Sequence, residues 1–123
     1  MVVDDESAVR EVTAELLTSM GFGVLQAEGG GRACELFAEH GASIDLVLLD
    51  MTMPDMDGEQ TLQALRALRP DVRVVVMTGY AEEDAAQRFS QHPFTVFVAK
   101  PFARRELVAA IQRARADGTW GPS

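Results

Sequence analysis

Short apolar runs alternate along the chain with longer segments in which apolar residues recur every three or four positions. The runs are typical of strands, and the longer spacing is typical of amphipathic helices. The runs predict strands at residues 1–3, 23–27, 44–49, 72–77 and 95–99. A helix is predicted after each strand, at residues 7–22, 31–40, 58–69, 82–91 and 104–117.

Helical spacing also predicts which side chains face the core. Ser7 is in position to cap the first helix, and Gly21 is in position to end it. The side chains expected to point inward are Val9, Val12, Leu16, Leu17, Leu62, Leu65, Leu68, Leu107, Val108 and Ile111. Cys34 lies at helical spacing with Leu36 and Phe37, and we interpret it as a small core residue.

The strict alternation of strands and helices predicts an α/β fold. The run at residues 72–77, VRVVVM, is almost entirely apolar. A strand of this kind is covered on both faces, as in a parallel sheet with helices on each side. We therefore expect one domain over residues 1–117, an open three-layer sandwich, followed by a tail or linker remnant at residues 118–123.

Composition narrows the classes of function. The chain has 123 residues, one cysteine and a formal net charge of −8. A single cysteine excludes an internal disulfide and fits a reducing compartment. The negative charge argues against nucleic-acid binding by this domain, because phosphate recognition needs a basic patch. No apolar run is long enough to span a membrane and no signal peptide is visible, so we expect a cytoplasmic domain without membrane contact.

Polar side chains follow four of the predicted strands. They are Asp4 and Asp5 after the first strand, Asp50 after the third, Thr78 after the fourth and Lys100 after the fifth. In an open α/β sheet, ligands bind beyond the carboxyl ends of the strands, where these side chains would meet. Any one of them alone is typical of a turn, a cap or a surface charge, so it is their convergence that predicts a site.

The residue types at this edge predict phosphoryl chemistry. Burying the carboxylate of Asp50 at the end of the run LVLLD is costly unless the charge is paired or solvated. Clustered carboxylates suit a hard cation such as Mg²⁺, which keeps open positions for phosphate oxygens. A lysine and a hydroxyl can neutralise and orient a phosphoryl group, and a carboxylate can be the nucleophile that forms an acyl phosphate.

The segments VVDDE, LVLLDMTMPDMDG, VVVMTGYAEED and VAKPF together resemble the receiver domain of two-component response regulators. The resemblance covers nearly the whole chain, in order and at matching spacings. It implies a flavodoxin-like (βα)5 fold with five parallel strands. A weaker resemblance is to the receivers found at the C-terminus of hybrid sensor histidine kinases.

Residue by residue, the resemblance implies that Asp50 is the phosphoacceptor. The acidic pair, Asp5 with Asp4 assisting, would hold Mg²⁺ or Mn²⁺ together with Asp50. The backbone carbonyl of Thr52 would complete the protein's ligands to the metal.

The resemblance also assigns catalytic and switch residues. Thr78 and Lys100 would contact the phosphoryl oxygens and so share the catalytic role with Asp50. Thr78 would also act as a switch with Phe97, which takes the place of an aromatic residue that is often tyrosine in this family. The bond between Lys100 and Pro101 is expected to be cis, although few X–Pro bonds are.

The function implied by the resemblance is phosphorelay signalling. Asp50 would accept a phosphoryl group from the phosphohistidine of a sensor histidine kinase or of a histidine phosphotransfer domain, and water would later remove it. The domain would thus catalyse its own phosphorylation and dephosphorylation. Partner binding would switch through the face built from the fourth helix, the fifth strand and the fifth helix, and this face could also join two copies in a homodimer.

Three other classes of protein share parts of this pattern. A phosphatase or mutase of the haloacid-dehalogenase type places its nucleophile after the first strand in an Asp-x-Asp pattern, whereas residues 4–7 read Asp-Asp-Glu-Ser. A flavodoxin needs a phosphate loop rich in serine, threonine and glycine there, and acidic residues would repel a phosphate without a metal. A degenerate receiver that serves only for docking would not need the intact set of site side chains.

Overall fold

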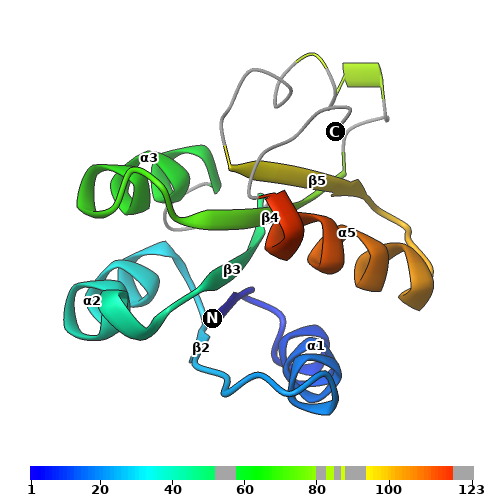
Figure 1. The fold of residues 1–123 in the computed structure, drawn as a ribbon, viewed down its shortest axis with the longest axis horizontal. Helices are drawn as coiled ribbons and strands as arrows, with labels where there is room; N and C mark the ends of the chain where they lie inside the picture. The colour runs from blue at the N-terminus through cyan, green and yellow to red at the C-terminus, as the bar shows by residue number, and fades with distance from the viewer. Residues whose placement is uncertain (52–57, 80–82, 85–86, 88–93, 118–123) are drawn as a thin grey trace.

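The structure is a computed structural model that describes residues 1–51, 58–79, 83–84, 87 and 94–117. Within these ranges, five strands form one parallel sheet in the order β2-β1-β3-β4-β5 (Figure 1). The strands are β1 Val2–Val3, β2 Gln26–Ala27, β3 Leu46–Asp50, β4 Arg73–Thr78 and β5 Thr95–Ala99. The predicted parallel sheet is confirmed.

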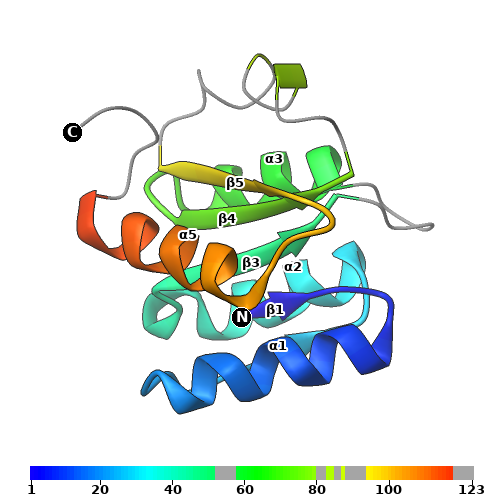
Figure 2. The ribbon, with the colours of Figure 1, turned by 90° about the vertical axis from the view of Figure 1, so that its right-hand side faces the viewer.

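Helices cover both faces of this sheet. They are α1 Ser7–Ser19, α2 Gly30–His40, α3 Gly58–Leu68 and α5 Arg104–Asp117, with a short 3₁₀ turn, η1, at Gly41–Ser43. α1 and α5 lie against one face, and α2 and α3 lie against the other (Figure 1, Figure 2). This three-layer arrangement confirms the flavodoxin-like α/β fold class. The helix expected at residues 82–91 falls mostly outside the described residues.

The central strands show why their sequences are unbroken apolar runs. Every residue of β3 is buried, and successive side chains of a strand point to opposite faces of the sheet. Val47 and Leu49 enter the core formed with α2 and α3, whereas Leu46 and Leu48 enter the core formed with α1 and α5. The side chains of β4 are divided between the same two cores. Both strands are therefore held on two sides, which fixes the residues at their carboxyl ends.

The apolar stripe of α1 faces a different direction from the predicted one. Val12 is 66% exposed and Val9 is 37% exposed, so the prediction that both point inward is wrong. Thr13 and Ala14 are buried instead, because the helix turns the flank that carries the valines toward solvent. The two valines line a groove between α1 and the segment that leads into α5. Predicted inward residues that are buried are Leu16, Leu17, Leu62, Leu65, Leu107 and Ile111, and Val108 is partly buried.

The end of α3 also differs from the prediction. Leu68 is 54% exposed, although the spacing predicts that it points inward. Arg69 follows Leu65 by one helical turn, and its guanidinium donates hydrogen bonds to the carbonyls of Gly41 and Ile44 at 2.9 and 2.6 Å. The next inward position after Leu65 is thus used by the arginine, which ties α3 to the chain beside α2.

The two ends of α1 differ in how well the sequence predicts them. The N-cap is Glu6, without a side-chain cap hydrogen bond, and Ser7 is already helical, so the predicted serine cap is wrong. The carboxylate of Asp4 shapes this entry instead, because it accepts a hydrogen bond from the N–H of Glu6 at 2.9 Å. Gly21 follows the helix with a φ of 96°, a left-handed conformation that favours glycine, as predicted.

Candidate functional site

Four strands bring the predicted site residues to one edge of the sheet. The residues at the carboxyl ends are Asp4 after β1, Asp50 in β3, Thr78 in β4 and Lys100 after β5. The parallel register aligns these ends, since Asp50 is paired with Met77 and Thr78 is paired with Ala99. Thr52, the expected source of a backbone carbonyl, lies outside the described residues.

The carboxylate of Asp50 is buried and paired with a lysine. Its side chain is 2% exposed, and its Oδ1 lies 3.1 Å from Nζ of Lys100. The lysine side chain is 33% exposed, and its ammonium offsets the buried charge of Asp50. The backbone N–H of Lys100 donates to the carbonyl of Thr78 at 2.7 Å, and the bond from Lys100 to Pro101 is cis, as predicted. A buried strand can therefore end on a carboxylate.

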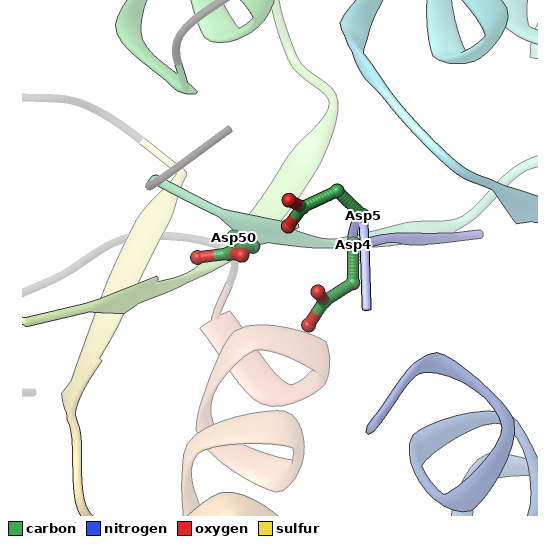
Figure 3. Close-up of side chains that lie close together, drawn as sticks. All are labelled: Asp4, Asp5 and Asp50. Atoms are coloured by element: carbon green, nitrogen blue, oxygen red, sulfur yellow. The ribbon is translucent and has the colours of Figure 1, made fainter. Parts of the chain in front are cut away.

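Two more carboxylates lie beside Asp50. Asp4, Asp5 and Asp50 each offer one oxygen, and these three oxygens lie within 4.8 Å of one another. Figure 3 shows the three side chains gathered where β1 and β3 end. Asp4 and Asp50 are buried, whereas Asp5 is exposed. A cluster that is open on one side suits a cation that keeps some of its water ligands.

Asp4 is the member of this cluster with the least compensation for its charge. Its Oδ2 is buried and has no hydrogen-bond partner in the part of the chain that the structure describes. Burial is the main cause that raises the pKa of Asp4, and the neighbouring Asp50 and Asp5 raise it further. The N–H of Glu6 and the ammonium of Lys100 oppose this shift. A divalent cation would satisfy the unpaired oxygen and reduce the repulsion, so the donor set fits Mg²⁺ or Mn²⁺.

The predicted switch residues lie on neighbouring strands. Thr78 is almost completely buried at the end of β4. Phe97 is partly buried and packs against the core formed with α2 and α3. Its partner in the sheet register is Val76, and the alternation of β4 places Val76 and Thr78 on the same face. Thr78 and Phe97 are thus neighbours on one face of the sheet, an arrangement that permits coupling between them.

One contact at the site is not predicted from the sequence. Arg10, on α1, donates from Nη1 to the backbone carbonyl of Asp4 at 3.0 Å and from Nε to the side chain of Gln26 at 3.3 Å. Arg10 thus connects α1 both to the end of β1 and to β2. An isolated arginine on a helix is typical of a solvent-exposed charge, so nothing in the sequence pattern marks this role.

The family of this domain follows from its similarity to known proteins. Residues 1–112 match the model of a family described as response regulator receiver domain. The chain belongs to this family. The receiver domains of two-component systems accept phosphoryl groups in phosphorelay signalling, so the resemblance and the general role expected from it are confirmed.

Relatives of this receiver domain occur in proteins of very different length. It is 35% identical over 112 residues to the sensor kinase CckA of Brucella abortus (strain 2308), which covers 91% of the chain and 12% of the kinase. It is 32% identical over 113 residues to sporulation initiation phosphotransferase F of Bacillus subtilis (strain 168), which covers 92% of the chain and 90% of that protein.

Solved structures support the same assignment. A chain in the crystal structure of the CheX-CheY-BeF3-Mg complex from Borrelia burgdorferi matches this receiver domain with a TM-score of 0.79 and 26% identity. The match covers 91% of this chain and 84% of that chain. Across the described ranges of this receiver domain, no helix has the length and apolar character needed to cross a membrane.

Proposed function

We propose that this receiver domain accepts a phosphoryl group on the carboxylate of Asp50. The observation that supports this most directly is a buried Asp50 carboxylate 3.1 Å from Lys100, with two further carboxylates beside it. In phosphoryl transfer, positioning and charge neutralisation provide most of the catalysis. A buried carboxylate between a lysine and a pair of acids that can bind a cation meets both needs.

The phosphoryl group passes from the nitrogen of a phosphohistidine to one oxygen of Asp50. The N–P bond breaks as the O–P bond forms, and the imidazole takes a proton from solvent. The product is an acyl phosphate, which water cleaves to inorganic phosphate and the free carboxylate. The donor is a sensor histidine kinase or a histidine phosphotransfer domain, in line with relatives named as a sensor kinase and a phosphotransferase.

Lys100 and Thr78 orient the group that is transferred. The side chain of Lys100 is 33% exposed, which leaves room for its ammonium to turn from Oδ1 of Asp50 to a phosphoryl oxygen. The hydroxyl of Thr78 donates a hydrogen bond to another phosphoryl oxygen. Both residues thereby favour the pentavalent arrangement over the free carboxylate, since they gain a new negatively charged partner as the bond forms.

Asp4, Asp5 and Asp50 are the side chains that would hold Mg²⁺ or Mn²⁺. The buried Oδ2 of Asp4 and the short distances among the three carboxylates support this assignment. When bound, the ion supplies positive charge that offsets the negative oxygens of the phosphoryl group. The magnesium and beryllofluoride in the related complex from Borrelia burgdorferi are consistent with such a site.

Phosphorylation changes the face built from β5, α5 and the helix expected at residues 82–91. The phosphoryl group adds about two negative charges at Asp50, toward which the hydroxyl of Thr78 moves. The space that Thr78 leaves can be filled by the ring of Phe97, which shares its face of the sheet. A host kinase, a phosphotransfer protein or a second copy of the chain would then bind the altered face.

Replacing the phosphoacceptor tests this function. Incubation with a small phosphodonor and Mg²⁺ should add the mass of one phosphoryl group to the wild type, and a chelator should prevent the gain. Asp50→Asn should gain nothing, because an amide cannot form the acyl phosphate. Asp45→Asn, which changes an exposed acid just before β3, should behave as the wild type does. Full phosphorylation of the Asp50→Asn protein would contradict the proposal.

A further inference from the structure

The backbone of Gly58 at the start of α3 lies directly against Met51 at the end of β3. Gly58, the first residue of α3, is buried, and its N–H donates to the carbonyl of Met51 at 3.4 Å. A methyl group built on Gly58 would overlap both Cα and Sδ of Met51 and would lie 3.1 Å from the carbonyl oxygen of Asp50. The φ of Gly58 is outside the left-handed region, so this position needs space and not conformational freedom.

We propose that Gly58 is a positioning residue for phosphoryl transfer. Its missing side chain lets α3 close on the end of β3, and this contact fixes the carboxylate of Asp50 between Lys100 and the acidic pair. The inference rests on the proposed role of Asp50 and adds to it a residue that never touches the phosphoryl group. Alanine is ordinarily a better helix former than glycine, so helix propensity alone would favour a side chain at this position.

The helix cannot move away to make room for a side chain. Leu62 and Leu65 hold α3 in the core against the sheet. Arg66 donates from Nη2 to Oγ1 of Thr95 at 2.7 Å, which ties the helix to the start of β5. Arg69, just beyond the helix, donates to two carbonyls near η1. Moving α3 would disturb all of these contacts at once, so the helix is the rigid side of the contact.

The strand is rigid along most of its length as well. β3 pairs with β1 on one side and β4 on the other, and all its residues are buried. The displacement is therefore confined to the residues at its end. Met51 is only partly buried and is held there by its N–H, which donates to the carbonyl of Met77 at 3.0 Å. A shift of Met51 passes through one peptide bond to Asp50, whose oxygen is 3.1 Å from Lys100.

The chain offers a matched control for this substitution. Gly31 lies in the first turn of α2, and a methyl group built on it would meet nothing within 4 Å. Gly58→Ala should slow phosphorylation by a small phosphodonor about 10- to 100-fold, since small misplacements of reacting groups have effects of that size. Gly31→Ala should leave the rate at the wild-type value.

A second readout reports the position of Asp50 without any phosphorylation. In the unphosphorylated protein, the carbon-13 signal of the Asp50 carboxyl and the side-chain signals of Lys100 should shift in Gly58→Ala and stay unchanged in Gly31→Ala. If the wild type accepts no phosphoryl group, the proposed function fails, and the carboxyl signal still tests the positioning role.

A double variant separates positioning from stability. Met51→Ala in the Gly58→Ala protein removes the overlap with Sδ but leaves the overlap with the backbone Cα. The double variant should regain only part of the thermal stability lost in Gly58→Ala and should remain slow, because the backbone overlap persists. It serves as the test protein if Gly58→Ala alone does not fold. A folded variant with the wild-type rate and an unshifted Asp50 carboxyl signal would overturn the proposal, as would a double variant whose rate recovers together with its stability.

Discussion

Asp4 is buried at the end of β1, and burial raises the pKa of its carboxyl above the ordinary value of 3.8. The folded protein therefore binds the Asp4 proton more tightly than the unfolded chain does. At pH values above the raised pKa, the ionised carboxylate lowers the free energy of unfolding. This penalty is lost as the pH falls through the raised pKa toward 3.8, so this residue alone makes the fold more stable in mild acid.

Asp4→Asn should therefore be more stable than the wild type at neutral pH when no divalent metal is present. The amide keeps an oxygen for the N–H of Glu6 and removes the buried charge. The difference in Tm should shrink as the pH falls through the raised pKa of Asp4, which thermal unfolding at a series of pH values in the presence of a chelator would measure. Glu15→Gln, an exposed change on α1, should alter stability by less than about 0.5 kcal/mol. A difference that grows toward acid pH would contradict this account.

Asp50 is paired with Lys100 at the same edge of the sheet. A carboxylate that is 2% exposed is tolerated because the lysine reaches it from the next strand but one, across β4. The lysine remains 33% exposed and can exchange partners without being buried itself. The same contact thus stabilises the resting fold and, in the proposed function, would supply the positive charge that phosphoryl transfer requires.

At the scale of elements, α1 has the predicted period and a different buried face. Leu17 is 2% exposed, whereas Val12 is 66% exposed, although both belong to the predicted apolar stripe. The helix packs against β1 on the face of the sheet that also carries α5. This packing determines which part of the wide apolar stripe of α1 is buried. The rest of the stripe, which includes Val9 and Val12, lines the groove at the surface.

Substitutions on the two parts of this stripe should have different costs. Leu17→Ala should lower the free energy of unfolding by about 2–5 kcal/mol, because it leaves a cavity in a filled core. Val12→Ala should change it by less than about 0.5 kcal/mol, because the side chain is mostly in water already. Urea denaturation of the two variants measures both values. Equal losses would mean that α1 packs through the stripe expected from the spacing.

At the scale of the whole molecule, the sheet joins the site to a distant face. Thr78 ends β4, Phe97 lies in β5, and α5 packs over both strands on the opposite face of the sheet (Figure 2). In the proposed function, a change at Asp50 would reach the surface through β4 and β5 without any unfolding. Coupling of this kind needs an element with two arrangements, and the proposed element is the pair Thr78 and Phe97.

Beryllofluoride, a mimic of the phosphoryl group, should reveal this coupling. With Mg²⁺ present, backbone amide signals should shift at Thr78, along β5 and along α5. The Asp50→Asn protein should not respond, which controls for effects of the salt. If the shifts stop at the residues that follow the strands, and β5 and α5 remain silent, transmission through Thr78 and Phe97 is wrong.

The succession of strands and helices along the chain, the parallel sheet and the residues that gather at its edge could all be predicted from the sequence. Apolar periodicity reflects burial on one or two faces, so the run LVLL predicts a central strand without knowledge of its neighbours. Chain order then places Asp50, Thr78 and Lys100 at the same edge, because parallel strands share one direction. These features depend on local pattern and on topology alone.

The covered side of α1 depends on how the segments pack together, as does the burial of Asp4 within the acidic pair. The same holds for the hydrogen bond from Arg10 to the backbone of Asp4. The second strand, predicted over residues 23–27, is shortened to Gln26–Ala27. Each of these outcomes depends on contacts between segments far apart in the chain, which no local pattern records. The contact of Gly58 with Met51 is of the same kind, since a glycine in a sequence does not reveal which backbone will lie against it.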